Sequence, residues 1–295
     1  MKKKLLFVYN PKAGKEKIRE SLADVLDIFA EADYDMTVVP TRRRDEAREV
    51  VRDRKRDYDL VVCSGGDGTL DETVTGMIQS GFSTPVGYIP AGSTNDYGES
   101  LGLSRNMAEA ARTAITGRDY ACDMGSFNDD IFVYIAAFGL FTDVSYETDQ
   151  AMKNVLGHMA YVLEGMKRLS NVRSYPLKIT HDGEVIEDEF IFGMITNSRS
   201  VGGFKNITGK NVEMDDGLFE VTLIKMPTNP VELSAILNSL VNRDVDTDMM
   251  YCFRTSELTV ESEEPLAWTL DGENGGAHEK ALIKNLHKTV QIRVD

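Results

Sequence analysis

The chain has 295 residues, a net charge of -15 at pH 7, 42% hydrophobic residues and 27% charged residues. This composition is typical of a globular protein and the length favours two domains. The negative charge argues against nucleic-acid binding, because contacts with phosphates supply most of that affinity. Three scattered cysteines without C-x-x-C spacing argue for a reducing cytoplasm and against a disulfide framework. The longest apolar stretch, 131–141, is too short to cross a bilayer, so we expect a soluble protein.

The first 90 residues predict strands that alternate with helices. Apolar runs indicate strands at 4–9, 36–39, 60–64 and 86–89, and helical patterns occur at 18–29, 45–54 and 70–77. Alternation of this kind implies right-handed crossovers and a mainly parallel sheet within a layered α/β domain.

After about residue 124 the sequence becomes rich in strands with short connections. Strands are predicted at 132–137, 177–181, 189–196, 219–224, 258–261, 267–270 and 290–294. Asp182 and Gly183 predict a type I′ hairpin turn, since Asp-Gly is favoured in that geometry. A helix expected at 151–169 carries methionine and aliphatic residues at helical spacing; we expect this face to point to the core, the alternative being a lipid-facing surface.

These patterns predict an α/β protein with two domains. The first, 1–124, would be a layered α/β domain with a mainly parallel sheet. The second, 125–295, would be a largely antiparallel β-sandwich, with its last residues returning to the first domain.

A glycine-rich turn, Gly-Gly-Asp-Gly-Thr at 65–69, joins the third predicted strand to the following helix. Glycines allow close backbone approach, and the amides of the first helical turn point at the ligand, so such a turn binds anions. Asp67 would repel a phosphate unless a divalent cation lay between them. The turn therefore predicts a site for a nucleotide and Mg²⁺.

Two further loops, 10–15 and 90–96, leave the carboxyl ends of predicted strands, where parallel α/β sheets bind their ligands. In the second loop, Ser93 and Thr94 could donate to phosphate oxygens, while Asn95 and Asp96 could orient water or metal. The alternative for this loop is an ordinary capped turn that opens the next helix. Its place beside the 65–69 turn favours the binding site.

These motifs resemble the diacylglycerol kinase catalytic domain family, which includes bacterial soluble diacylglycerol kinases and eukaryotic sphingosine and ceramide kinases. No Walker loop occurs, and the Rossmann G-x-G-x-x-G spacing fails at Asp71. The stretch 144–148 most resembles the soluble bacterial enzymes. Besides the 65–69 turn, the motifs are Asn-Pro-x-Ala-Gly at 10–14, Gly-Ser-Thr-Asn-Asp at 92–96, Asp-Met-Gly at 123–125, Ala-Phe-Gly-Leu-Phe-Thr at 137–142, Gly-Gly-Phe at 202–204, Met-Asp-Asp-Gly at 214–217 and Asp-Gly-Glu at 271–273.

The resemblance implies an α/β nucleotide domain and a β-sandwich with ATP in the cleft between them. Glu273 would be the general base. Asp67 and Asp96 would belong to the network around a catalytic Mg²⁺, which Lys15 would help to hold. The ATP-binding residues would be Asn10, Gly65, Gly66, Gly68, Thr69, Glu72, Ser93, Thr94 and Asn95. A second, structural Mg²⁺ would be held by Asp215, Asp216 and the carbonyl of Leu218.

Two positions depart from the family pattern. Asp71 stands where the family usually has asparagine, and Ser93 where it often has threonine. Ser93 keeps a hydroxyl donor. Asp71 places a carboxylate near the phosphates, which is repulsive unless metal or Lys15 compensates, so we expect an effect on catalytic efficiency rather than on the reaction class.

We therefore expect an ATP- and Mg²⁺-dependent lipid kinase that phosphorylates a free lipid hydroxyl, with diacylglycerol as the substrate and phosphatidic acid as the product. It would be cytoplasmic, would touch the inner membrane surface transiently, and would be a homodimer, as related bacterial kinases often are. The alternatives are a kinase for another lipid (a sphingoid base or acylglycerol), an NAD kinase-like enzyme, or a catalytically silent lipid- or nucleotide-binding regulator.

Overall fold

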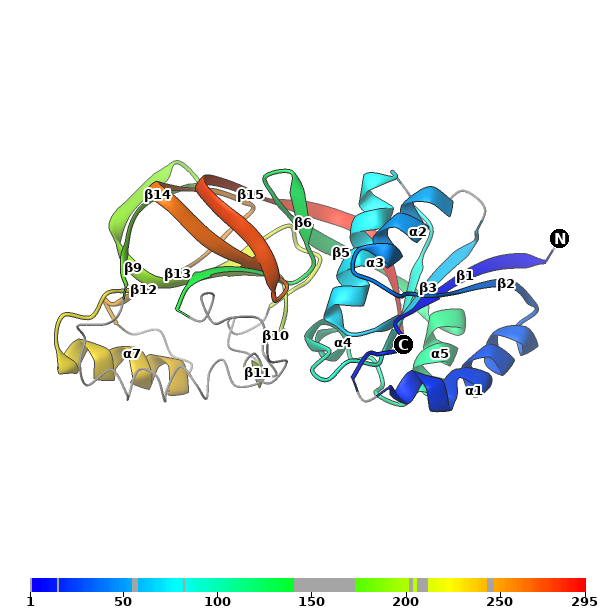
Figure 1. The fold of residues 1–295 in the computed structure, drawn as a ribbon. Coiled ribbons are helices and arrows are strands. Elements are labelled where there is room, and N and C mark those ends of the chain that lie inside the picture. Colours follow the sequence, from blue (N-terminus) through cyan, green and yellow to red (C-terminus); the bar gives the residue numbers. More distant parts are fainter. Residues whose placement is uncertain are drawn as a thin grey trace. The chain divides into compact units, whose positions relative to one another are not determined.

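The computed structural model describes residues 2–14, 16–54, 58–81, 83–140, 173–201, 204–205, 212–242 and 247–295. The chain divides into two compact units (Figure 1). Unit 1 comprises Met1–Met124 and His287–Asp295, and unit 2 comprises Gly125–Leu286. Two strands run from one unit into the other, β5 (Arg118–Phe127) and β15 (Glu273–Val294).

Unit 1 is built on parallel strands covered by helices. Its strands are β1 (Lys3–Tyr9), β2 (Tyr34–Pro40), β3 (Leu60–Gly65) and β4 (Val86–Pro90). They pair in parallel in the order β4-β3-β1-β2, and the end of β15 joins beside β4, with Ile292 opposite Val86. Every residue of β3 and β4 is buried, as expected for parallel strands covered on both faces.

The helices of unit 1 are α1 (Lys17–Glu31), α2 (Glu46–Arg54), α3 (Asp67–Gln79), α4 (Asp96–Ser100) and α5 (Met107–Thr116). Helix α1 packs against α5, and α2 packs against α3 (Figure 1). The apolar face of α1 is buried on the sheet; for example, Phe29 meets Phe7 edge to face with ring centroids 5.4 Å apart. Burial of this apolar stripe, rather than helix propensity alone, holds α1 in place.

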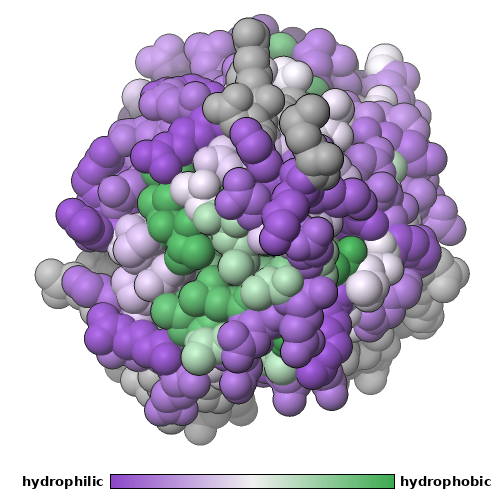
Figure 2. Space-filling model, turned by 90° about the vertical axis from the view of Figure 1, so that its right-hand side faces the viewer, coloured by the Kyte–Doolittle hydropathy of each residue, from purple (hydrophilic) through white to green (hydrophobic). Residues whose placement is uncertain are grey.

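One edge of the unit 1 sheet is apolar in part. Strand β2 is the edge strand on this side of the sheet, and its residue Val38 is 37% exposed. Figure 2 shows a face on which hydrophobic residues gather in the middle of a mostly hydrophilic surface.

Unit 2 is dominated by antiparallel strands. Besides parts of β5 and β15 these are β6 (Asp130–Phe132), β7 (Ile135–Gly139), β8 (Tyr175–His181), β9 (Glu184–Thr196), β10 (Ser200–Val201), β11 (Phe204–Lys205), β12 (Phe219–Lys225), β13 (Met250–Thr255) and β14 (Glu257–Leu270), with helix α7 (Pro230–Asn242). Strand β8 pairs with both β9 and β14, and β7 pairs with the same two strands further along, so the sheet folds back on itself. A register shift between Glu261 and Leu266 accompanies the change of partner along β14.

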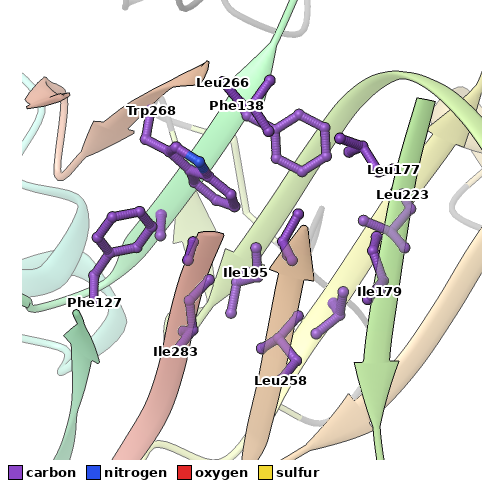
Figure 3. Close-up of a cluster of buried hydrophobic side chains, with 14 of the residues drawn as sticks. Phe127, Phe138, Leu177, Ile179, Ile195, Leu223, Leu258, Leu266, Trp268 and Ile283 are labelled. Carbon is purple, nitrogen blue, oxygen red and sulfur yellow. The ribbon is translucent and has the colours of Figure 1, made fainter. Parts of the chain in front are cut away.

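The inward side chains of these strands form one buried hydrophobic cluster (Figure 3). Trp268 lies within it, with its ring centroid 4.9 Å from that of Phe127 and 5.0 Å from that of Phe138. Aromatic pairs at such distances contribute about 0.5–1.5 kcal/mol each beyond the burial of their area.

The predicted mixed α/β fold, with a strand-rich second part, is confirmed. The predicted hairpin at Asp182 and Gly183 is also confirmed, with φ values of 48° and 82°. The single strand expected at 132–137 is wrong, because a bend at 133–134 separates β6 from β7. The backbone amides at this bend donate to the carboxylate of Asp271.

The helix expected at 151–169 lies outside the described residues. Among the helices in the described part of the chain, none has the length and apolarity needed to span a membrane.

We expect Ile195→Ala to lower the free energy of unfolding of unit 2 by about 2–5 kcal/mol, because this side chain is fully buried in the cluster and its loss leaves a cavity. Urea unfolding followed by the fluorescence of Trp268, the sole tryptophan, would measure the change. Val185→Ala is the control, since Val185 is 54% exposed and should change stability by about 0.5 kcal/mol or less. Equal effects of the two substitutions would contradict the prediction.

Candidate active site

Three loops meet at the carboxyl ends of β1, β3 and β4. The amide of Asn10 donates to the carbonyl of Ser64 at 2.8 Å. The carbonyl of Gly65 accepts the amides of Ala91, at 2.7 Å, and Gly92, at 3.1 Å. The expected convergence of loops 10–15, 65–69 and 90–96 is therefore confirmed for their described residues.

Two glycines make this approach possible. Gly14 has a φ of +57°, and a Cβ atom there would lie 2.5 Å from the carbonyl oxygen of Ala91. A Cβ atom on Gly92 would lie 2.5 Å from the Cα atom of Gly66. Larger residues would push the loops apart.

The carboxylate of Asp67 joins the first turn of α3 to the start of α4. Its oxygens accept the backbone N–H groups of Asp96 at 3.1 Å and Tyr97 at 3.2 Å. Burial raises the pKa of Asp67 to about 6, the charge of Asp96 acts in the same direction, and the amide hydrogen bonds oppose them. A cation beside the two carboxylates would favour their charged forms.

Asn95 closes the loop that precedes α4. Its backbone has a φ of 56°, its Oδ1 accepts the amide of Gly92 at 2.8 Å, and its Nδ2 donates to the Gly92 carbonyl at 2.9 Å. The hydroxyl of Tyr88 donates to the carbonyl of Gly65 at 3.2 Å from beneath the loop. Ser93 is exposed and Thr94 is half-buried, so their hydroxyls lie on a loop whose backbone is held by other groups.

At the N-terminus of α3, one residue, Gly68, has open space beside it. Thr69 is buried and folds over Gly65, where a Cβ atom would lie 2.2 Å from the Thr69 hydroxyl oxygen. A Cβ atom on Gly68 would have no heavy atom within 4 Å, and the Gly68 amide has no acceptor among the described residues. A helix start with an unused amide and adjacent space suits an anion.

The side chains of Glu72 and Asn10 accept hydrogen bonds from backbone amides. The carboxylate of Glu72 accepts the amides of Asp45 at 2.8 Å and Ala47 at 3.1 Å, and so caps α2; burial raises its pKa. The Oδ1 of Asn10 accepts the amide of Lys12 at 2.9 Å. As nucleotide ligands both residues stay predictions, and Lys15 lies outside the described residues.

The structure adds Thr41 to this edge of the sheet, which sequence reasoning missed. Thr41 follows β2 and is buried, and its amide donates to the carbonyl of Tyr9 at 2.8 Å. Its position directly after a predicted strand is the sequence signal that could have identified it.

The remaining predicted residues belong to unit 2. Glu273 is exposed and follows the two-residue turn between β14 and β15. Asp216 accepts the amide of Leu218 at 3.0 Å through Oδ1, and its Oδ2 pairs with Arg254. Arg254 also lies 3.3 Å from Glu220, whose pKa burial raises to about 7.

In the described residues, no three acidic, histidine or cysteine side chains are grouped to hold a metal ion. The positive charge next to Asp216 comes from Arg254. The structural Mg²⁺ site therefore stays a prediction.

Two family models match the chain. The model described as the diacylglycerol kinase catalytic domain matches residues 4–127, and the model described as the YegS C-terminal NAD kinase beta sandwich-like domain matches residues 136–287.

Proteins named diacylglycerol kinase are similar over nearly the whole chain. The one from Bacillus subtilis (strain 168) is 29% identical over 292 residues, covering 98% of this chain and 96% of the relative. The one from Staphylococcus haemolyticus (strain JCSC1435) is 31% identical over 295 residues, covering 99% and 88%. The crystal structure of a putative diacylglycerol kinase from Bacillus anthracis str. Sterne matches with a TM-score of 0.84 at 26% identity, covering 100% of this chain and 98% of the other.

We expect Gly65→Ala and Gly68→Ala to have opposite effects on stability. The first should cost about 1–3 kcal/mol, because the new methyl group overlaps Thr69. The second should cost nothing, and replacing a helical glycine can add up to about 1 kcal/mol. Because unit 1 has no tryptophan, urea unfolding should be followed by circular dichroism. A destabilised Gly68→Ala protein would contradict the open space at the start of α3.

Proposed function

Because the chain belongs to the diacylglycerol kinase family, we propose that it transfers the γ-phosphate of ATP to the free hydroxyl of diacylglycerol and so forms phosphatidic acid. The observation that supports this most directly is the open start of α3 at Gly68, framed by the loops that follow β1 and β4. Phosphoryl transfer needs positioning and charge neutralisation more than covalent chemistry by the protein, and such a site provides both.

The residues around Gly68 fit the phosphates of ATP. The unused amide of Gly68 offers a donor in the part of the chain that the structure describes, and the absent side chain leaves room for a phosphate oxygen. The hydroxyls of Ser93 and Thr94 would add donors from the neighbouring loop. Lys15 would supply a positive charge on the first loop.

Asp67 and Asp96 are the residues that would hold the catalytic Mg²⁺. Asp67 begins α3 and Asp96 begins α4, and the charged form of Asp67 is destabilised by burial and by Asp96. Mg²⁺ would supply the positive charge that offsets this repulsion and neutralises the phosphates. The carboxylate of Asp67 would keep its hydrogen bonds to the α4 backbone while it faces the ion or its water shell.

Glu273 would act as the general base. An alcohol hydroxyl has a high pKa, so a carboxylate must take its proton as the new bond to phosphorus forms. Glu273 is exposed and sits directly after a tight turn, so its carboxylate is accessible to a lipid hydroxyl.

The lipid substrate requires contact with a membrane. We propose that the protein works from the cytoplasm at the inner membrane surface and that it is a homodimer. NAD is the alternative acceptor, because the second matched domain is described as NAD kinase beta sandwich-like.

We expect Glu273→Gln to lower phosphoryl transfer to diacylglycerol in mixed micelles by about 100-fold or more, the usual contribution of a general base. Labelled ATP would measure the transfer, with diacylglycerol, a sphingoid base and NAD as parallel acceptors. Glu184→Gln is the matched control, because Glu184 follows the same Asp-Gly turn in the β8–β9 hairpin. Transfer to NAD but to no lipid would contradict the proposed function and indicate an NAD kinase instead. Full activity of Glu273→Gln would contradict the role of Glu273 as general base.

We expect Gly68→Ala to keep the fold but raise the KM for ATP, since its methyl group would occupy the phosphate space. A steric cost of about 1–3 kcal/mol corresponds to a roughly 5- to 150-fold loss of affinity. The KM for the lipid acceptor is the internal control and should stay unchanged. An unaltered KM for ATP in a folded variant would place the phosphates elsewhere.

A further inference from the structure

The chain contains the tripeptide Asp-Gly-Glu twice, at 182–184 and at 271–273. Both copies form the same two-residue turn between antiparallel strands. The φ values are 48° and 82° at Asp182 and Gly183, and 50° and 85° at Asp271 and Gly272. Positive φ at both central residues defines the type I′ hairpin turn, so the local backbone does not distinguish the two copies.

The two aspartates differ in what their side chains contact. Asp182 has a side chain that is 56% exposed, with His181 Nδ1 at 3.3 Å and a hydrogen bond to the side chain of Thr255. Asp271 is only 6% exposed, and its carboxylate accepts three consecutive backbone amides: Val133 at 2.5 Å, Tyr134 at 2.9 Å and Ile135 at 2.9 Å. The Asp271 amide donates in return to the Ile135 carbonyl at 2.9 Å.

These four hydrogen bonds fasten the turn at 271–272 to the bend between β6 and β7. Successive amides that converge on one carboxylate form a strong, charge-assisted contact. The contact is shielded from water, because the residues of the bend are themselves buried. At the turn 182–183 the carboxylate of Asp182 contacts side chains, those of His181 and Thr255, among the described residues. Backbone amides of a neighbouring segment therefore hold only the second turn.

We propose that Asp271 is a positioning residue that fixes the turn and thereby the direction of Glu273. This inference rests on the proposed function, in which Glu273 takes the proton of the acceptor hydroxyl. Glu273 is two residues from Asp271 and is exposed, so burial does not orient it, and the anchored backbone sets the direction in which its side chain leaves the turn. Misplacement of a catalytic group by about 1 Å can cost on the order of 100-fold in rate.

Asp271→Asn isolates this contact. Asparagine tolerates positive φ, so the turn is kept, but its amide group replaces one acceptor oxygen with a donor that faces backbone N–H groups. Asp182→Asn makes the identical change in the exposed turn and is the matched control. Amide hydrogen exchange of residues 133–135 should become faster in Asp271→Asn and stay unchanged in Asp182→Asn.

Kinetics separate positioning from a general loss of structure. For Asp271→Asn we expect kcat to fall by on the order of 100-fold while the KM for ATP stays within about twofold, because the phosphate site is in unit 1. In the background of Glu273→Gln, the same substitution should have no further effect, since a residue that acts only through Glu273 has nothing left to position.

Each outcome has a separate meaning. An active wild type with an equally active Asp271→Asn overturns the positioning role alone. A further loss of similar size in the Glu273→Gln background also overturns it and assigns Asp271 a structural role. A wild type that phosphorylates no acceptor overturns the proposed function, and the positioning role with it. Non-additive losses confined to kcat establish the inference.

Discussion

Carboxylates of buried or half-buried residues that accept backbone N–H groups hold together the loops on which the proposed chemistry depends. Asp67 holds the start of α4, and Glu72 holds the start of α2. Asp123 is fully buried in β5 and accepts the amide of Lys288 in β15 at 2.7 Å. Asp271 holds the bend at 133–135. Hydrogen bonds to an ionised acceptor are stronger than neutral ones, and leaving such a carboxylate unpaired would be costly, so each contact specifies one arrangement of its loops.

The same contacts explain how a strongly acidic chain can offer an anion site. Asp67 neighbours the proposed phosphate position, yet its oxygens are directed to the backbone of α4. At the start of α3 the Gly68 position is left with an amide and open space. In the proposed function, the amides and the partial positive charge of the helix start would act on a phosphate, and a cation would offset the repulsion between the carboxylates and neutralise the phosphates.

Much of this was predictable from local pattern. The apolar runs at 4–9, 60–64 and 86–89 correspond to β1, β3 and β4, because buried parallel strands require continuous apolar residues. The glycine-rich turn correctly indicated a helix after β3, although α3 begins at Asp67, three residues before the predicted start. The partners of Glu72 and Asp216 were not predictable: one carboxylate caps α2 and the other pairs with Arg254, which is 38 residues away in the chain. Such contacts depend on which strands become neighbours.

The sequence by itself determined the alternation of strands and helices, the glycine-rich turn at the end of β3 and the type I′ turn at Asp182 and Gly183, because each depends on residues within a few positions of one another. Only the tertiary structure decided which Asp-Gly turn is anchored. The carboxylate of Asp271 reaches amides that lie more than 130 residues earlier in the chain, whereas Asp182 remains exposed. Identical local sequences acquire different roles because a side chain's partners are set by the packing of distant strands.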